Sequence, residues 1–131
     1  MKMFYWAIVH HDEGSAFGVS FPDLPDCFAA ADDERDIMKN AIAALDDYFS
    51  DGHEAPTAMS LNEVKREVKE DLAEGAYLIQ VPVIPLTSKS VRVNLSMDSG
   101  LLAAIDDAAS RLGLNRSAFI AQAARREIEA A

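Results

Sequence analysis

A chain of 131 residues with a net charge of −10 has room for one domain or two small ones. Half of its residues are hydrophobic, which excludes a disordered polymer, and no stretch approaches the roughly 18 apolar residues of a membrane span. The N-terminus lacks the long apolar segment of a signal peptide, and a single cysteine, Cys27, excludes an internal disulfide. We therefore expect a globular, cytoplasmic protein without membrane attachment.

The segment from 1 to 84 predicts a small α+β domain with helices packed on a sheet. Its expected element order is β-β-β-α-(α)-β. Aromatic and branched residues bounded by turn residues predict strands at 3–9, 16–21, 27–31 and 77–84. The prolines within 22–26 predict a rigid connection between the second and third strands. Pro82 favours a sheet edge or a strand end for the last strand.

Two helices are expected between the third strand and the last. The first spans 33–50, with Asp32 or Asp33 as its N-cap. The second opens with Ser60-Leu61-Asn62-Glu63, a sequence with the pattern of a capping box, and ends at Gly75.

After a linker at 85–88, residues 90–96 alternate strictly between polar and apolar side chains. This period of two predicts a strand whose apolar face is made by Val91, Val93 and Leu95. Two amphipathic helical patterns follow. Gly113 suits the left-handed residue that ends the first helix, and Asn115 suits the N-cap of the second.

One strand and two helices cannot close a core alone, because the strand leaves both hydrogen-bonding edges open and the segment buries little surface. Antiparallel pairing of two copies solves both problems. The apolar face of the resulting ribbon covers the helices, and its polar face points outward. A two-stranded ribbon fits the major groove of B-DNA, so Arg92 and Asn94 become candidates for contacting base edges.

This part of the chain closely resembles the ribbon-helix-helix family of DNA-binding proteins. The match covers VRVNLSMDSGLLAAIDDAASRLGLNRSAFIAQAARREI, including the turn at 113–117. In that family the turn presents the N-terminal amides of the second helix to a DNA phosphate. The resemblance implies that 89–131 is a dimerisation and DNA-binding domain, forming a homodimer or a higher even-numbered assembly. Its candidate operator contacts are Ser90, Arg92, Asn94, Asn115, Arg116 and Ser117.

The negative charge lies in the N-terminal part alone. Residues 1–74 hold 17 acidic and 6 basic side chains, a net charge of −11, whereas residues 89–131 hold 5 acidic and 6 basic, a net charge of +1. Nucleic acid would be repelled by the first part and a basic partner attracted. This separation predicts two different partners for the two parts.

The N-terminal part resembles the corresponding domain of HicB-type antitoxins. The motifs that carry this resemblance are GVSFPDLPDCFAAADD, AIAALDDYF and YLIQVPV, although the family often has glycine where this chain has Asp26. The family has a partial ribonuclease H-like fold and binds HicA toxins, which are small basic ribonucleases. The resemblance implies a non-enzymatic antitoxin without cofactor or metal, which also represses its own operon. Its candidate toxin contacts are Asp23, Asp26, Asp32 and Asp33.

The same sequence gives little support for nuclease, metal-binding or cysteine chemistry. Two-metal nuclease chemistry needs converging carboxylates, but the first strand contains no acid, and surface charge is the simplest role of the four aspartates. The run His10-His11-Asp12-Glu13 is more typical of a solvated turn than of a metal site, since adjacent extended residues point to opposite sides. Cys27 has no positioned base and is expected to be a small buried residue. The remaining alternative is a stand-alone ribbon-helix-helix repressor whose N-terminal domain senses a ligand or adds an oligomer contact.

Overall fold

The computed structural model describes residues 4–84 and 89–130. The chain divides into two compact units, Met1–Leu86 and Thr87–Ala131. The expected linker, 85–88, lies outside the described residues. Among the helices of the described residues, none is both long enough and apolar enough to cross a bilayer.

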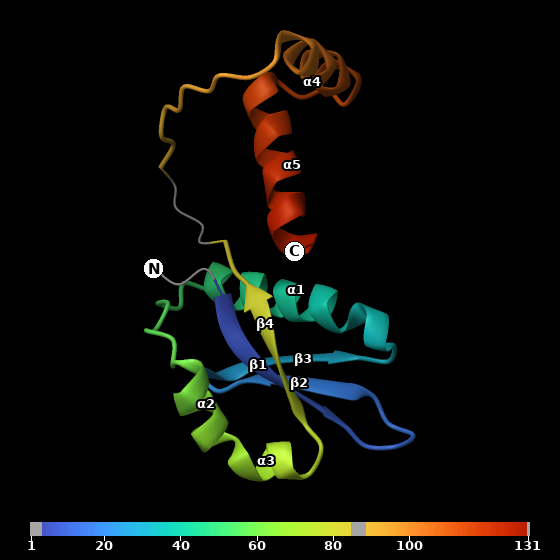
Figure 1. Ribbon diagram of the computed structural model, residues 1–131, viewed down its shortest axis with the longest axis vertical. Helices are drawn as coiled ribbons and strands as arrows, with labels where there is room; N and C mark the ends of the chain where they lie inside the picture. The colour runs from blue at the N-terminus through green and yellow to red at the C-terminus, as the bar shows by residue number, and fades with distance from the viewer. Residues whose placement is uncertain (1–3, 85–88, 131) are drawn as a thin grey trace. The chain divides into compact units, whose positions relative to one another are not determined.

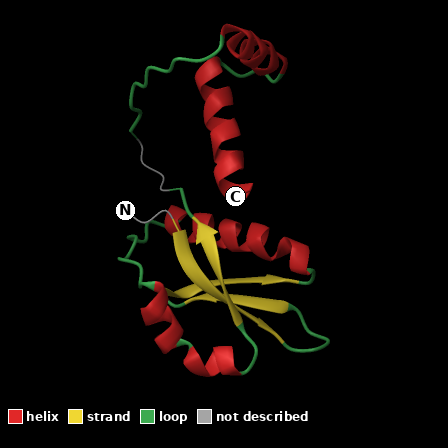
Figure 2. Ribbon diagram, viewed as in Figure 1, coloured by secondary structure: helices red, strands yellow, loops and turns green. Residues whose placement is uncertain are grey.

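The N-terminal unit is built on a four-stranded antiparallel sheet with the strand order β3-β2-β1-β4 (Figures 1 and 2). Its strands are β1 (Phe4–His11), β2 (Phe17–Phe21), β3 (Leu24–Ala31) and β4 (Tyr77–Pro82). β4 is an edge strand that ends at Pro82, opposite Phe4, as the missing N–H of proline predicts.

The expected strand bounds were wrong at several ends: β2 begins one residue later and β4 ends two residues earlier than expected, and the other two strands are longer. β1 continues to His11 because His10 and His11 pair with Gly18 and Phe17 of β2. β3 begins at Leu24 rather than Cys27, since a tight turn at 22–23 and a register shift at Ser20/Phe21 bring Phe21 opposite Leu24. Pro25 and Asp26 are therefore strand residues, which an edge strand tolerates.

Both predicted helices form, each with a departure at one point. The first begins as a 3₁₀ turn, η1 (Glu34–Asp36), capped by the Asp33 carboxylate, and continues as α1 (Ile37–Ser50). The second is divided into α2 (Leu61–Glu67) and α3 (Lys69–Ala73) at Val68, whose φ of −109° and ψ of 23° leave the helical region. Ser60 Oγ accepts from the Glu63 N–H at 3.2 Å, as the capping-box pattern predicts.

Helices pack on both faces of the central strand β1 (Figure 1). Tyr5, Ala7 and Val9 are buried in a cluster that includes Ala41 and Leu45 of α1. Ile8 is buried on the opposite face with Val64 and Val68. This burial on both sides explains the continuous aromatic and branched run of the first strand.

The C-terminal unit contains α4 (Ser99–Arg111) and α5 (Arg116–Ala130). Gly113, with φ at +69°, ends α4 in a Schellman motif, in which the Leu114 N–H donates to Ala109 O at 2.8 Å and the Gly113 N–H to Ser110 O at 3.1 Å. The Asp98 carboxylate caps the start of α4. A Cβ at Gly100 would lie 3.0 Å from Asp98 Oδ2, so glycine leaves room for this cap.

The strand expected at 90–96 is absent from the single chain. Residues 89–97 carry no regular secondary structure, and Val91 is 81% exposed, Val93 67% and Leu95 61%. A strand is defined by its hydrogen-bonded neighbour, and within the described residues this segment pairs with no other strand. The alternation is present in the sequence, but among the described residues no strand lies beside this segment to pair with it.

The buried stripe of α1 generates a stability prediction. Leu45→Ala leaves a cavity in the core and should lower the free energy of unfolding of the N-terminal unit by about 2–5 kcal/mol. Leu61→Ala removes the same atoms from a side chain that is 38% exposed and should cost less than about 1 kcal/mol. Urea denaturation, monitored by the fluorescence of Trp6, the single tryptophan, measures the free energy of unfolding of both variants. Equal losses would contradict the assignment of the core.

Candidate functional site

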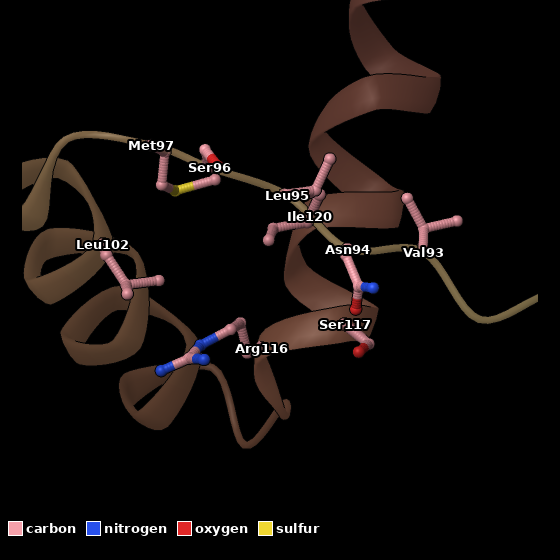
Figure 3. A pocket seen from close by; sticks show the side chains of 9 residues that line it. All are labelled: Val93, Asn94, Leu95, Ser96, Met97, Leu102, Arg116, Ser117 and Ile120. Carbon is pink, nitrogen blue, oxygen red and sulfur yellow. The ribbon is translucent and has the colours of Figure 1, made fainter.

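A hollow in the C-terminal unit lies between the extended segment and the two helices (Figure 3). Its volume is about 580 Å³, and both apolar and polar side chains line it: Val93, Asn94, Leu95, Ser96, Met97, Leu102, Arg116, Ser117 and Ile120. Three of the six residues predicted to contact DNA, Asn94, Arg116 and Ser117, therefore meet at one hollow. Ser90 and Arg92 lie on the exposed part of the segment and do not line it.

Asn115 is the N-cap of α5, as its position after Gly113 predicts. Its Oδ1 accepts from the Ala118 N–H at 2.8 Å, and its carbonyl accepts from the Phe119 N–H. The helix begins at Arg116, so the N–H groups of its first turn have no acceptor within the helix. The exposed Ser117 lies in this turn, at the positive end of the helix dipole.

The Arg116 side chain joins the two helices. Its Nε and one terminal nitrogen donate to the two carboxylate oxygens of Asp106 on α4, at 2.9 and 2.8 Å. These hydrogen bonds lower the pKa of Asp106 and raise that of Arg116. The guanidinium thus holds α5 against α4, and the backbone at Arg116 remains the part suited to an anion. A second ion pair, between Arg111 and Asp107, lies within α4.

The four aspartates predicted to contact a toxin do not form one site. Asp23 and Asp32 flank the two ends of β3, an eight-residue strand that spans roughly 26 Å. Asp23 is half-buried, its Oδ1 accepts from the Met59 N–H at 3.0 Å, and its Oδ2 is buried without a hydrogen-bond partner among the described residues. Its structural role is to join the β2–β3 turn to the segment that leads into α2.

Asp33 is also occupied within the fold. It caps η1 and forms a bidentate ion pair with Arg35, which lowers the pKa of the Asp33 carboxyl. Asp32 is exposed beside it, and Asp26 is exposed on β3. Asp26 lines a hollow of the N-terminal unit.

The hollow beside Asp26 contains acidic residues that the sequence prediction missed. It has a volume of about 180 Å³ and lies between β3 and the C-terminal half of α1, lined by Asp26, Cys27, Phe28, Ala44, Asp47, Tyr48, Asp51 and His53. The spacing of Asp47 and Asp51, one helical turn apart, was the signal in the sequence that could have indicated them.

Cys27 is buried beneath this hollow, as predicted. Its thiol donates to the Ala44 carbonyl, with sulfur and oxygen 3.6 Å apart. Burial, and to a smaller extent the charge of Asp47, raises the pKa of Cys27 to about 11. The thiol is thus protonated at neutral pH and is a poor nucleophile. No group of three or more His, Cys, Asp or Glu side chains within 4–84 and 89–130 is arranged to hold a metal ion.

Comparison with known families decides the identity of the chain. Residues 5–124 match the model of the HicB-like antitoxin of bacterial toxin–antitoxin systems. The chain belongs to the HicB-like antitoxin family. It is therefore an antitoxin rather than an enzyme, as the sequence predicts.

Individual HicB proteins show how far the similarity extends. Antitoxin HicB 2 of Photorhabdus laumondii is 29% identical over 93 residues, which cover 68% of this chain and 66%, just under two thirds, of that protein. The crystal structure of the Burkholderia pseudomallei antitoxin HicB covers 96% of both chains at 29% identity, with a TM-score of 0.53. That of antitoxin HicB3 covers 96% of this chain and 98% of its own at 31% identity, with a TM-score of 0.54.

The Arg116–Asp106 pair of this HicB-family chain generates a prediction on pH. Arg116→Gln should return the lowered pKa of Asp106 toward the ordinary carboxyl range, because its main cause is the hydrogen bond from Arg116. The folded-state pKa lies below the unfolded one, so the pair stabilises the unit at neutral pH, and this contribution is lost as pH falls through the folded-state pKa. An NMR titration of the Asp106 carboxyl measures its pKa with and without the Arg116→Gln substitution.

Arg111→Gln, which removes the partner of the neighbouring Asp107, is the matched control and should leave the Asp106 pKa unchanged. An Asp106 pKa that stays low in Arg116→Gln would show that another group causes the shift.

Proposed function

We propose that this HicB-family protein neutralises a HicA-like ribonuclease through its N-terminal unit and represses its own operon as a DNA-bound dimer through its C-terminal unit. The observation that carries the DNA-binding half of the proposal is the exposed apolar alternation of Val91, Val93 and Leu95 directly before two helices. The half that concerns the toxin rests on membership of a toxin–antitoxin family together with the charge of the N-terminal unit.

A second copy supplies what the C-terminal unit lacks. Ala109 is the one buried residue of that unit among those described, and its exposed large side chains include Leu101, Leu112 and Ile128. Antiparallel pairing of segment 90–96 with its copy would satisfy the backbone groups of both and bring their apolar faces onto the helices. The product is a ribbon-helix-helix dimer.

When the apolar face of the ribbon packs on the helices, its polar face points toward solvent. Arg92 and Asn94 then lie where side chains enter the major groove, with Ser90 beside them, and arginine is suited to guanine and asparagine to adenine. The start of α5, capped by Asn115, offers backbone amides at Arg116 and Ser117 to a phosphate. Asn94, Arg116 and Ser117 line one hollow already in the single chain, which supports their joint use (Figure 3).

The N-terminal unit suits a protein partner rather than nucleic acid. Residues 1–74 carry a net charge of −11, and a basic toxin would be attracted to this surface while DNA and RNA would be repelled. The resemblance to HicB antitoxins implies a partial ribonuclease H-like fold for this sheet, but β1 contains no carboxylate that could hold a catalytic metal ion. Binding, not catalysis, is the function that this unit supports.

The DNA-binding half is tested by Arg92→Ala. Loss of a bidentate base contact costs about 1–3 kcal/mol per site, so affinity for the DNA upstream of the gene should fall at least about tenfold, while toxin neutralisation is unchanged. Electrophoretic mobility shift at fixed salt measures it. Arg126→Ala removes the same charge from an exposed position of α5 and should change affinity much less. Loss of both activities in a folded Arg92→Ala protein would contradict the division of labour.

The antitoxin half is tested by co-expression with the product of the adjacent reading frame. We expect that product to be a small basic protein that cleaves RNA alone, and to form a complex with this chain on size-exclusion chromatography in which cleavage is suppressed. If the neighbour does not bind, the N-terminal unit has lost its assigned partner, and a stand-alone repressor becomes the better description.

A further inference from the structure

We infer that the toxin docks on the surface formed by β3 and the C-terminal half of α1, with Phe28 as the apolar contact and Asp26, Asp47 and Asp51 as the charged ones. The inference rests on the proposed antitoxin function and places it on particular residues. We call Asp26, Phe28, Asp47 and Asp51 the β3–α1 surface. Of the four aspartates that the sequence predicted as toxin contacts, this surface contains only Asp26.

β3 is an open edge of the sheet. Within the described residues it pairs with β2 alone, so the outer row of its backbone groups has no neighbouring strand. One of its carbonyls, that of Ala30, accepts from Asn40 Nδ2 of α1 at 2.8 Å. A shallow hollow lined by Phe28, Ala30, Asn40, Ala43 and Asp47 continues along this edge.

Phe28 is exposed where the alternation of an edge strand usually places a polar side chain. Its neighbours in the alternation, Cys27 and Ala29, belong to the cluster beneath α1, whereas Phe28 is 66% exposed and lines the hollows between β3 and α1. Among the described residues of the N-terminal unit, Phe28 is the most exposed large hydrophobic side chain. A large apolar side chain on an open sheet edge favours association with another molecule.

The carboxylates of Asp47 and Asp51, beside Phe28, destabilise the helix α1 that carries them. Asp47 lies in the last turn of α1 and Asp51 is its C-cap residue, where the helix dipole disfavours negative charge, and that last turn contains no basic residue. Their spacing of four adds like-charge repulsion. Neither they nor Asp26 form an ion pair or accept a hydrogen bond through the carboxylate within the described residues. Carboxylates that destabilise their own helix and have no ion-pair partner within the described residues are explained by a cationic side chain on a binding partner.

A basic protein fits this surface better than a second copy of the chain. Asp46 and Glu54 add to the negative charge of the same region, and the one cation of α1, Lys39, lies two turns before Asp47. Two such surfaces facing each other would repel, as would a nucleic acid. A basic toxin meets the carboxylates with lysine or arginine, which the hollow of about 180 Å³ at Asp26, Asp47 and Asp51 can receive, and covers Phe28 with apolar side chains.

The test compares two charge reversals of equal size. Asp47→Lys with Asp51→Lys changes the β3–α1 surface, and Glu67→Lys at the end of α2 with Glu74→Lys at the C-cap of α3 changes the net charge by the same amount. Binding of the full-length protein to an immobilised, catalytically inactive form of the basic protein encoded next door gives the dissociation constants. We expect the first pair to weaken binding at least about 30-fold and the second less than about threefold, because close charge pairs contribute far more than distant ones.

The apolar contact is tested in the same assay by Phe28→Ala, for which we expect roughly tenfold weaker binding. Tyr77→Ala, a truncation of a 40% exposed side chain on the other edge strand, should have little effect. Urea denaturation monitored by Trp6 fluorescence establishes that each variant is folded.

Equal losses from the two charge reversals would indicate diffuse attraction and overturn the docking surface while leaving the antitoxin function standing. A change in the oligomeric mass of Phe28→Ala without toxin would assign the surface to a second copy and overturn it also. If the unaltered protein does not bind the neighbour, the proposed antitoxin function itself fails, and the docking surface fails with it.

Discussion

Backbone pairing is the constraint on which both units depend. In the N-terminal unit, β1 is hydrogen-bonded on both edges and buried on both faces, so its backbone groups and its apolar side chains are satisfied within one chain. The segment 90–96 has an equally clear apolar alternation, but within the described residues it has no neighbouring strand, and its valines remain exposed. The strands of the first unit all pair within one chain, whereas segment 90–96 of the second has no pairing strand among the described residues, and this difference is why we propose dimerisation through the second.

Charge divides the molecule along the same boundary. An acidic unit joined to a nearly neutral one can hold a basic protein without competing for the DNA that the other unit is proposed to bind. Some of this acidity is also badly placed for stability, as the aspartates at the C-terminal end of α1 show. Solubility alone does not require carboxylates at the negative end of a helix, because the same residues elsewhere on the surface would serve it equally well.

Local signals in the sequence were reliable where a single turn or cap decides the structure. Ser60 and Glu63 form the predicted cap, Gly113 adopts the predicted left-handed conformation, and Pro82 ends an edge strand. The candidate sites were harder to predict. Asp33 was correctly predicted as a possible helix cap, but its ion pair with Arg35 was not predicted, nor was the hydrogen bond that Asp23 accepts from Met59, 36 residues away. The spacing of Asp47 and Asp51 places them one helical turn apart, but only the packing of α1 on the sheet shows that they lie beside Asp26 and Phe28 of β3.

The sequence by itself determined the element order of the N-terminal unit, the residues that end or cap helices at Ser60, Gly113 and Asn115, the charge separation and the resemblance to HicB antitoxins, because these depend on composition and on residues a few positions apart. Only the tertiary structure decided where β3 begins, which aspartates are already engaged, and which of them share a hollow with Phe28. These features depend on contacts between residues distant in the chain, such as Asp26 and Asp51, whose proximity no spacing rule contains. The pairing of segment 90–96 was decided by neither, since no strand of the described residues lies beside it, and a second copy of the chain is our proposal for its partner.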